Sequence, residues 1–306
     1  MSKFKEMNAK LYMRDVEGFK EKLVEKALAD FWQDLGNGDV TSKAVLGQII
    51  ESEAEIITKH EGVLAGMLEA EAILRDGGIT LHDAMRDGDV LSKGDVIFRI
   101  RGPLDEILAR ERTVLNYIQR MSGIATLSRR VAEKWPGRVA YLRKCDPGLL
   151  LSEKRAVALG GCLTHRINLS DGIIIKDNHI AAVAAEGIND PINECVRRAA
   201  DFLKQADSLQ GVEIEVESLE DGLNAVDALK KVPGEHIIML DNMIPSELKK
   251  VVTALREHDS KLVIEASGGI KEGNIGEYLD AGADVVSSSF LVADAGYLDI
   301  SLNILK

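Results

Sequence analysis

The feature that most constrains this chain is a series of six short apolar runs in its second half, separated by stretches with a helical pattern. The runs are VAYL (139–142), GIIIK (172–176), VEIEV (212–216), HIIML (236–240), LVIEA (262–266) and DVVSS (284–288). Strands that alternate with helices indicate parallel βαβ units. Six such runs favour an α/β barrel over a small open sheet, and we predict that fold for this half.

Every predicted strand ends in polar or small residues. In barrels the site lies at the carboxyl ends of the strands, so these residues are expected to converge. This convergence predicts an enzyme. The residues are Arg143-Lys144, Lys176 to His179, Glu217, Asp241-Asn242, Ser267 to Gly269 and Ser287 to Ser289.

One half of the predicted site is basic, although the chain carries a net charge of -12. A local excess of cations in an acidic chain indicates a focused anion site, and several together predict a substrate with more than one anionic group. Lys154 and Arg155, which follow Glu153 in a helical pattern, are instead interpreted as surface charges. The basic residues of the site are Arg143, Lys144, His165, Arg166 and Lys176.

The other half is acidic. Glu213 and Glu215 share one strand face, and Asp241 follows a later strand. Acids that point into a barrel need partners, because burying an unpaired charge is costly. The partners are lysines, a metal ion or substrate hydroxyls, and Mg²⁺ suits carboxylates that also meet phosphate oxygens. A structural lysine–glutamate network is the alternative.

A phosphate site is predicted after the last two strands. Ser267, Gly268 and Gly269 precede a helix and offer free backbone N–H groups. Ser288 and Ser289 would lie beside them, where barrels often hold phosphate.

The first 103 residues read as an α+β unit with antiparallel strands, with helices expected over 16–35 and 67–75. A long helix is predicted from Leu104 to Arg120, a break at Ser122-Gly123, and a second helix after it. Periodicity alone assigns Arg112 to a solvated polar face of the long helix.

Composition excludes several classes of protein. No apolar run approaches the length needed to span a bilayer, and the first residues lack an apolar signal core. The spacing of the 3 cysteines fits neither a zinc site nor a disulfide framework. The acidic balance argues against a nucleic-acid or membrane surface. We therefore predict a cytoplasmic protein.

Several motifs, in order, resemble the quinolinate phosphoribosyltransferase (carboxylating nicotinate-nucleotide pyrophosphorylase) family. RKCDPG, GGCLTHR, IIIKDNH, VEIEVES, MLDNM and EASGGI carry the likeness in the second half, and GNGDVTS and ARERTVLNYIQRMSGIAT carry it in the first. The likeness runs from about residue 36 to residue 302. It implies an N-terminal α/β sandwich domain (1–119, joined by 291–306) and an open, incomplete α/β barrel (120–290).

The resemblance also implies a pentosyltransferase of NAD biosynthesis. Such enzymes join quinolinate to phosphoribosyl pyrophosphate with Mg²⁺, giving nicotinate mononucleotide, CO₂ and pyrophosphate. It implies a homodimer, or a larger oligomer built from it, in which Arg112 of one subunit completes the partner's site. By this likeness, Arg143, His165, Arg166 and Lys176 hold the pyridine dicarboxylate, and Lys144 lies near it and the pyrophosphate. Glu215 and Asp241 face the ribose and its metal, with Lys144 as the third catalytic residue, and Ser267, Gly268 and Gly269 take the 5′-phosphate.

Two places depart from the family pattern. Asp-Thr-Arg-Lys-Thr is replaced by Tyr141-Leu142-Arg143-Lys144-Cys145, which removes two hydroxyls. In the last strand, Ser289 replaces a glycine, Phe290 adds bulk, Ala293 replaces a histidine and Asp294 adds a negative charge. Two other functions therefore remain open. One is phosphoribosyl transfer to a different acid acceptor, and the other is a non-catalytic barrel that binds a nucleotide or anion.

Overall fold

The structure of the chain is a computed structural model that describes residue 12 and residues 15–48, 50–206, 209, 211–232 and 234–305. The chain folds into two compact units. We call Met1–Arg14, Trp135–Lys144 and Leu163–Phe290 the barrel unit. Asp15–Lys134, Cys145–Cys162 and Leu291–Lys306 form the antiparallel unit. Among the described residues, no helix is both long enough and apolar enough to cross a membrane.

The barrel unit is built on a 6-stranded parallel sheet in the order β6-β11-β10-β9-β8-β7. The six predicted runs form these strands, and β6 and β7 are the two edges, so the barrel is open as predicted. The strands are β6 (Val139–Tyr141), β7 (Ile173–Ile175), β8 (Gly211–Val216), β9 (Glu235–Asp241), β10 (Val263–Ser267) and β11 (Val285–Ser288).

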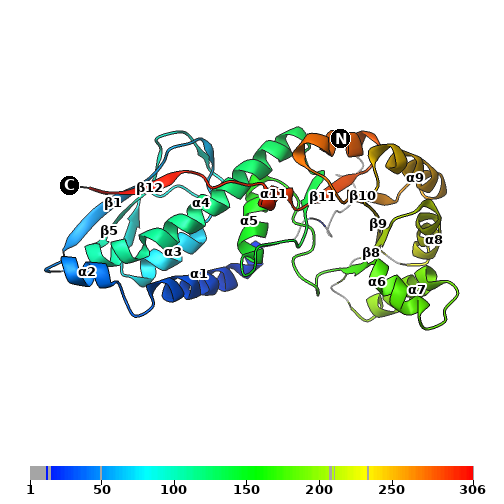
Figure 1. Cartoon of the computed structure of the whole chain (residues 1–306), viewed down its shortest axis with the longest axis horizontal. Coiled ribbons are helices and arrows are strands. Elements are labelled where there is room, and N and C mark those ends of the chain that lie inside the picture. Colours follow the sequence, from blue (N-terminus) through cyan, green and yellow to red (C-terminus); the bar gives the residue numbers. More distant parts are fainter. Residues whose placement is uncertain are drawn as a thin grey trace. The chain divides into compact units, whose positions relative to one another are not determined.

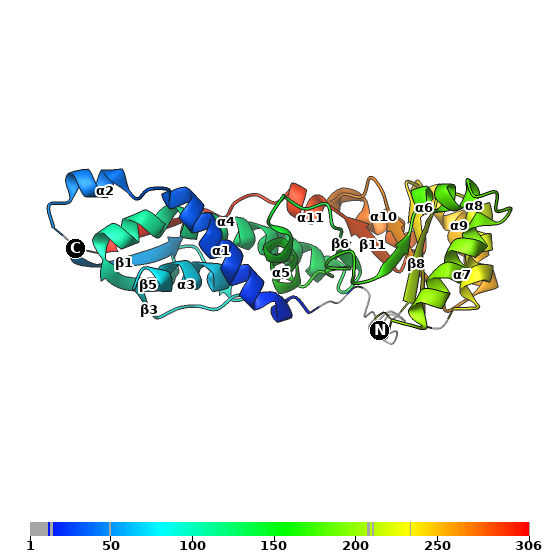
Figure 2. The same cartoon turned by 90° about the horizontal axis from the view of Figure 1, so that it is seen from below.

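Helices follow most of these strands and cover the sheet. Helices α7 and α8 pack on β8, and Figure 2 shows α7, α8 and α9 together on one side of it. Asp190 and Ser218 cap α7 and α8 with their side-chain oxygens, which fixes where each helix begins. The elements are α6 (Asp177–Ala184), α7 (Pro191–Leu203), α8 (Leu219–Leu229), α9 (Pro245–His258), the 3-10 helix η3 (Glu272–Asn274) and α10 (Ile275–Asp280). Helix α11 (Phe290–Ala293) comes next, and all of it after Phe290 belongs to the antiparallel unit.

The antiparallel unit has a 4-stranded sheet in the order β12-β1-β5-β3 and a short pair, β2-β4. Figure 1 shows β12, from the end of the chain, beside β1, and the two pair from Glu53–Leu305 to Thr58–Ile300. The elements are the 3-10 helix η2 (Glu17–Phe19), α1 (Lys20–Leu35), α2 (Val40–Val45), β1 (Glu51–Thr58), β2 (Gly62–Val63), α3 (Met67–Asp76), β3 (Thr80–His82), β4 (Val90–Leu91), β5 (Val96–Pro103), α4 (Leu104–Lys134), α5 (Leu150–Gly160) and β12 (Ile300–Leu305).

The predicted break at Ser122-Gly123 is wrong, because α4 continues without interruption to Lys134. Ser122 is fully buried, and its hydroxyl accepts the N–H of Ala65 at 3.0 Å and donates to its carbonyl at 3.2 Å. A Cβ on Gly123 would lie 1.8 Å from the carbonyl oxygen of Gly296. Both small residues therefore allow close approach of other segments to the helix, which a sequence pattern cannot distinguish from a helix end.

Gly123→Ala is expected to destabilise the protein by about 3 kcal/mol, because backbone must move to admit the methyl group. Urea unfolding measures this change as a lower midpoint. Gly276→Ala is the matched control, since Gly276 is also helical and a Cβ there would meet nothing within 4 Å. The control should be neutral or slightly stabilising through helix propensity. Equal midpoints for the two variants would contradict the close contact at Gly123.

The interpretation of Lys154 and Arg155 as surface charges is also wrong. Both lie in α5, which packs against α4, and they are 0% and 8% exposed. Arg155 donates to the carboxylates of Glu17 at 2.8 Å and Asp87 at 2.6 Å, which satisfies its buried charge.

The antiparallel unit also includes residues 120–134 and 145–162, whereas the predicted boundary lies at 119/120.

Candidate active site

The inward-facing side chains of the barrel unit lie in layers, because alternate residues of a strand share a face. On β10, Val263 lies near the amino end, Glu265 in the middle and Ser267 at the carboxyl end. On β8, Glu213 and Glu215 occupy the middle and upper positions of the same face. We call the layer at the carboxyl ends, which contains Glu215 and Ser267, the top layer, and it is the one that faces the pocket.

A pocket of about 300 Å³ lies at the carboxyl ends of these strands. It brings together eight of the thirteen residues predicted for the site, from five different strands and the segment before β7. The lining residues are Leu142, Arg143, Lys144, His165, Arg166, Ile174, Lys176, Glu215, Met239, Asp241 and Ser267.

The pocket has an excess of positive charge. Apart from His165, four basic side chains face two carboxylates, which leaves two formal positive charges in a chain of net charge -12. Within the described residues, the side chains of Arg143 and Lys144 have no hydrogen-bond or ion-pair partner. Burial, and then repulsion from Arg143, lower the pKa of Arg166, so its cation gains from a bound anion.

The acidic residues of the pocket are Glu215 and Asp241. Glu215 forms an ion pair with Lys176, and Asp241 accepts a hydrogen bond from the side chain of Asn242 at 2.7 Å. Two half-buried carboxylates at one pocket suit Mg²⁺, which takes oxygen ligands and commonly keeps waters and substrate phosphates in its remaining positions. The donor set therefore fits the predicted metal.

Glu213 does not line the pocket, so its assignment to the acidic half of the site is wrong. It is 1% exposed, and it lies one layer below Glu215 because it is two residues nearer the amino end of β8. Its carboxylate lies 3.5 Å from Nε2 of His165, and so does that of Glu265, which sequence reasoning missed. Glu265 lies inside the apolar run LVIEA, and a carboxylate within a buried strand could have indicated a buried partner for it.

His165 borders the pocket but is only 3% exposed, above the two glutamates. Burial alone would lower its pKa, but the charges of Glu213 and Glu265 outweigh burial and raise the pKa to about 9. The N–H of Arg166 lies 2.7 Å from Nδ1 and favours a lone pair there. In either protonation state Nε2 carries a proton that points toward the carboxylates.

Of the predicted phosphate residues, only Ser267 lines the pocket. Gly268 and Gly269 follow it with φ of 87° and 65°, and a Cβ on Gly268 would lie 2.3 Å from Oδ1 of Asn242. Ser288, on the neighbouring strand β11, donates to the carbonyl of Ile270 at 2.6 Å. This bond holds the loop that contains Gly268 and Gly269. Ser289 is half-buried and does not line the pocket.

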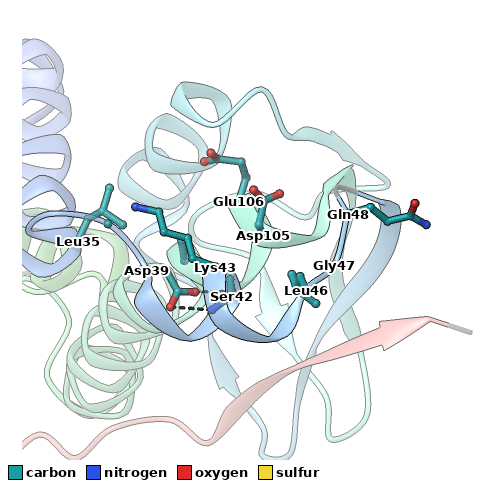
Figure 3. A pocket seen from close by; sticks show the side chains of 11 residues that line it. Leu35, Asp39, Ser42, Lys43, Leu46, Gly47, Gln48, Asp105 and Glu106 are labelled. Carbon is teal, nitrogen blue, oxygen red and sulfur yellow. Dashed lines mark hydrogen bonds between the residues drawn. The ribbon is translucent and has the colours of Figure 1, made fainter.

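Arg112 belongs to the antiparallel unit, where it is exposed on α4. A hollow of about 490 Å³ lies in the same unit between α2 and the start of α4 (Figure 3). Asp39 in this hollow accepts the N–H groups of Thr41 and Ser42 and caps α2. None of the predicted site residues lines it.

Comparison with known proteins identifies relatives over nearly the whole chain. Residues 39–122 match the model of the quinolinate phosphoribosyl transferase N-terminal domain, and residues 124–303 match that of its C-terminal domain. The "Probable nicotinate-nucleotide pyrophosphorylase (carboxylating)" of Methanothermobacter thermautotrophicus is 38% identical over 89% of this chain and 95% of its own. The "Quinolinate phosphoribosyltransferase (decarboxylating) 1" of Nicotiana glauca is 34% identical over 92% of this chain and 81% of its own.

Solved structures give the same result. The nicotinate-nucleotide pyrophosphorylase from Francisella tularensis superposes with a TM-score of 0.80 at 28% identity, over 94% of this chain and 97% of that one. NadC from Streptococcus pyogenes superposes with a TM-score of 0.76 at 32% identity, over 96% and 99% of the two chains.

Proposed function

The chain belongs to the quinolinate phosphoribosyltransferase family, and we propose on that premise that it transfers phosphoribose to quinolinate with decarboxylation. Phosphoribosyl pyrophosphate is the donor, and the products are nicotinate mononucleotide, CO₂ and pyrophosphate. This is a pentosyltransferase step of NAD biosynthesis. The observation that carries the proposal is one pocket that joins unpartnered basic side chains to two carboxylates among the described residues.

The basic side chains bind the pyridine diacid. Arg143 and Arg166 offer planar guanidinium groups that match carboxylate oxygens, and Lys176 adds a point charge. His165 lies beneath them and completes the acid-binding half. These three cations match a substrate with two carboxylates better than a neutral ring.

The carboxylates act on the ribose. As the bond from C1 to pyrophosphate breaks, C1 gains positive charge, which Glu215 and Asp241 stabilise. The pyridine nitrogen attacks C1, and the ring becomes cationic. The cationic ring nitrogen stabilises the electron pair that stays on C2 when the adjacent carboxylate departs as CO₂, and C2 then takes a proton from water. No protein nucleophile is required, and burial raises the pKa of the Cys162 thiol to about 12, which keeps it unreactive.

Mg²⁺ needs negative ligands and the pyrophosphate needs positive charge, and the pocket at the carboxyl ends of the strands offers both. Glu215 and Asp241 would hold the ion together with substrate oxygens. An ion held by these residues would supply countercharge for the departing pyrophosphate. Lys144, which is exposed at the pocket and has no hydrogen-bond partner among the described residues, adds a second positive charge there. Ser267, Gly268, Gly269, Ser288 and Ser289 form the proposed 5′-phosphate site.

A homodimer would complete the acid-binding half with the partner subunit's Arg112. The exposed face of α4 supports this assembly, because Leu108, one turn before Arg112, is a large apolar side chain that is 37% exposed. Val40 and Val45 of α2 in the same unit are 74% and 73% exposed. An exposed apolar side chain one turn from an exposed arginine suits a surface that a second copy covers. The proposal also keeps the cytoplasmic location that the composition predicts.

A different acid acceptor is the second candidate function, and the residues around Arg143 favour testing it. Leu142 and Cys145 stand where the family has hydroxyls. Tyr141 is buried, and its hydroxyl donates to the carbonyl of Lys144 at 3.2 Å, so it shapes the turn instead of binding substrate. Phe290 is 4% exposed, so its bulk is in the core.

Product formation from quinolinate and phosphoribosyl pyrophosphate is expected only when Mg²⁺ is present. Chromatography measures nicotinate mononucleotide, and a coupled assay measures pyrophosphate. Product with EDTA in excess would contradict the metal assignment. Without product, calorimetric binding of phosphoribosyl pyrophosphate alone would favour another acceptor, and binding of neither substrate would favour the non-catalytic barrel.

A further inference from the structure

Tyr12 fills the interior of the barrel unit near the amino ends of the strands, opposite the pocket. It is 1% exposed, although it precedes every helix and strand that the structure describes. Apolar residues from four strands and one other position form one buried cluster with it. They are Ala140, Leu163, Ile237, Val263 and Val285.

The side chain of Tyr12 reaches up to the middle layer of the barrel. Its hydroxyl donates a hydrogen bond to Glu265, and its ring meets the ring of His165 edge-on, with centroids 5.1 Å apart and planes at 84°. Burial, followed by the charges of Glu265 and Glu213, raises the pKa of Tyr12 well above its usual value, so the hydroxyl keeps its proton. Tyr12 is therefore a permanent donor to this layer.

The backbone of Tyr12 holds the residue next to the pocket as well. Its carbonyl accepts the N–H groups of Thr164 at 2.9 Å and His165 at 3.0 Å, and the hydroxyl of Thr164 at 3.2 Å. His165 has a φ of 52°, in the left-handed region that side chains other than glycine rarely adopt. Such a conformation persists only where surrounding contacts impose it, and Tyr12 supplies these contacts.

His165 also contacts the backbone of Arg166, the next residue of the pocket. The N–H of Arg166 lies 2.7 Å from Nδ1 of His165, and its guanidinium donates to the carbonyl of Gly172 at 3.0 Å. Contacts therefore run without a gap from Tyr12 through His165 to the basic half of the pocket.

The buried group of His165, Glu213 and Glu265 has the composition of a metal site, but its hydrogen bonding does not suit one. Nδ1 lies next to a backbone N–H, so in the neutral imidazole the proton is on Nε2, and in the cation Nε2 carries a proton as well. Nε2 is the atom that faces both carboxylates, and it has no lone pair to offer a metal. One oxygen of each glutamate has no hydrogen-bond partner in the described residues, which makes the donor from Tyr12 more important.

We propose that Tyr12 is a positioning residue for the acid acceptor: it supports His165 and Glu265 from below and so fixes the basic half of the pocket. This inference rests on the proposed function. Removing the hydroxyl leaves Glu265 to compete with Glu213 for the proton on Nε2, and the His165 ring loses its fixed orientation. Glu215 pairs with Lys176, and Asp241 accepts a hydrogen bond from Asn242. The part of the pocket proposed to bind phosphoribosyl pyrophosphate therefore does not depend on Tyr12.

Tyr12→Phe is the first test, because it deletes one oxygen and keeps the ring. Calorimetry measures the Kd of quinolinate and of phosphoribosyl pyrophosphate, and initial rates give KM for each. We expect Kd and KM of quinolinate to rise about three- to ten-fold through loss of a buried hydrogen bond to a charged group. The values for phosphoribosyl pyrophosphate should stay within error. Tyr12→Leu, which also removes the ring contact, should raise the quinolinate values further.

Tyr117→Phe is the matched control. Tyr117 is 6% exposed, and its hydroxyl donates to the carboxylate of Asp30 at 2.6 Å in the antiparallel unit. This variant loses the same type of bond and should show a comparable fall in Tm, but no change in the Kd of quinolinate. The pair thus separates lost stability from lost positioning.

Unchanged quinolinate binding in both Tyr12 variants would overturn the proposal. An equal rise for both substrates would overturn it too, because it would show general loosening of the fold. Failure of the unaltered protein to bind quinolinate would count against the proposed function itself, which the binding measurement on that protein detects first.

Discussion

Glu215→Gln is expected to lower kcat by about 100- to 1,000-fold, the range seen when one electrostatic contact to a transition state is removed. The amide keeps the shape of the side chain but removes the charge that would stabilise the ribose cation. Steady-state rates at saturating Mg²⁺ measure the effect. The ion pair with Lys176 gives the change a second consequence.

Without its carboxylate partner, Lys176 is free to interact with an incoming anion. The Kd of quinolinate should therefore stay constant or fall while kcat collapses. Glu217→Gln is the control, because Glu217 is exposed just beyond the end of β8 and does not line the pocket. Unaltered turnover in Glu215→Gln, or an equal loss in Glu217→Gln, would remove Glu215 from the catalytic role.

Most of the barrel could be predicted because its signals are local. Each of the six strands is an apolar run that ends in polar residues, and a parallel sheet brings the ends to one edge. Arg143, Lys176 and Asp241 follow directly from that rule, and they line the same pocket. The family resemblance then supplied roles that residue types alone leave open.

The errors arose where depth or long-range contact decides the outcome. The alternation of side chains along a strand places Glu213 and Glu215 on one face but does not say which lies deeper. Glu213 is a buried partner of His165, whereas Glu215, one layer above, lines the pocket. The sequence pattern predicts a helix end at Gly123, but a glycine is needed there because the carbonyl of Gly296 packs against it. That contact comes from a segment far along the chain. Tyr12 carries no pattern, since only the fold brings it to Glu265.

The division of the pocket into layers suggests how substrate binding and catalysis are kept separate. In the proposed site, His165 and Arg166 rest on a buried layer that contains Glu265, whereas Glu215 and Asp241 lie at strand ends with partners of their own. Substitutions in the buried layer should therefore change the affinity for the acid. Substitutions of Glu215 and Asp241 should change turnover.

A mixture of the variants Arg112→Ala and Arg143→Ala is expected to regain activity that neither variant has alone. Each variant removes one guanidinium from the proposed acid-binding half, and each should lower kcat/KM for quinolinate at least about 100-fold, as for loss of one member of a buried charge pair. If Arg112 acts in the partner's pocket, a mixed dimer contains one site with both changes and one with neither. Random exchange of subunits should then restore about a quarter of the sites.

The recovery is measured after the two variants are mixed, unfolded together and refolded, with native mass spectrometry to count mixed dimers. The control mixes Arg112→Ala with the double variant Arg112→Ala/Arg143→Ala, which forms mixed dimers but no intact site. Recovery in the first mixture alone would establish that the site is shared, because no rearrangement within one subunit restores both arginines. Mixed dimers without recovery would mean that Arg112 serves its own subunit or no site at all, and its exposure on α4 would then be that of an ordinary solvated arginine.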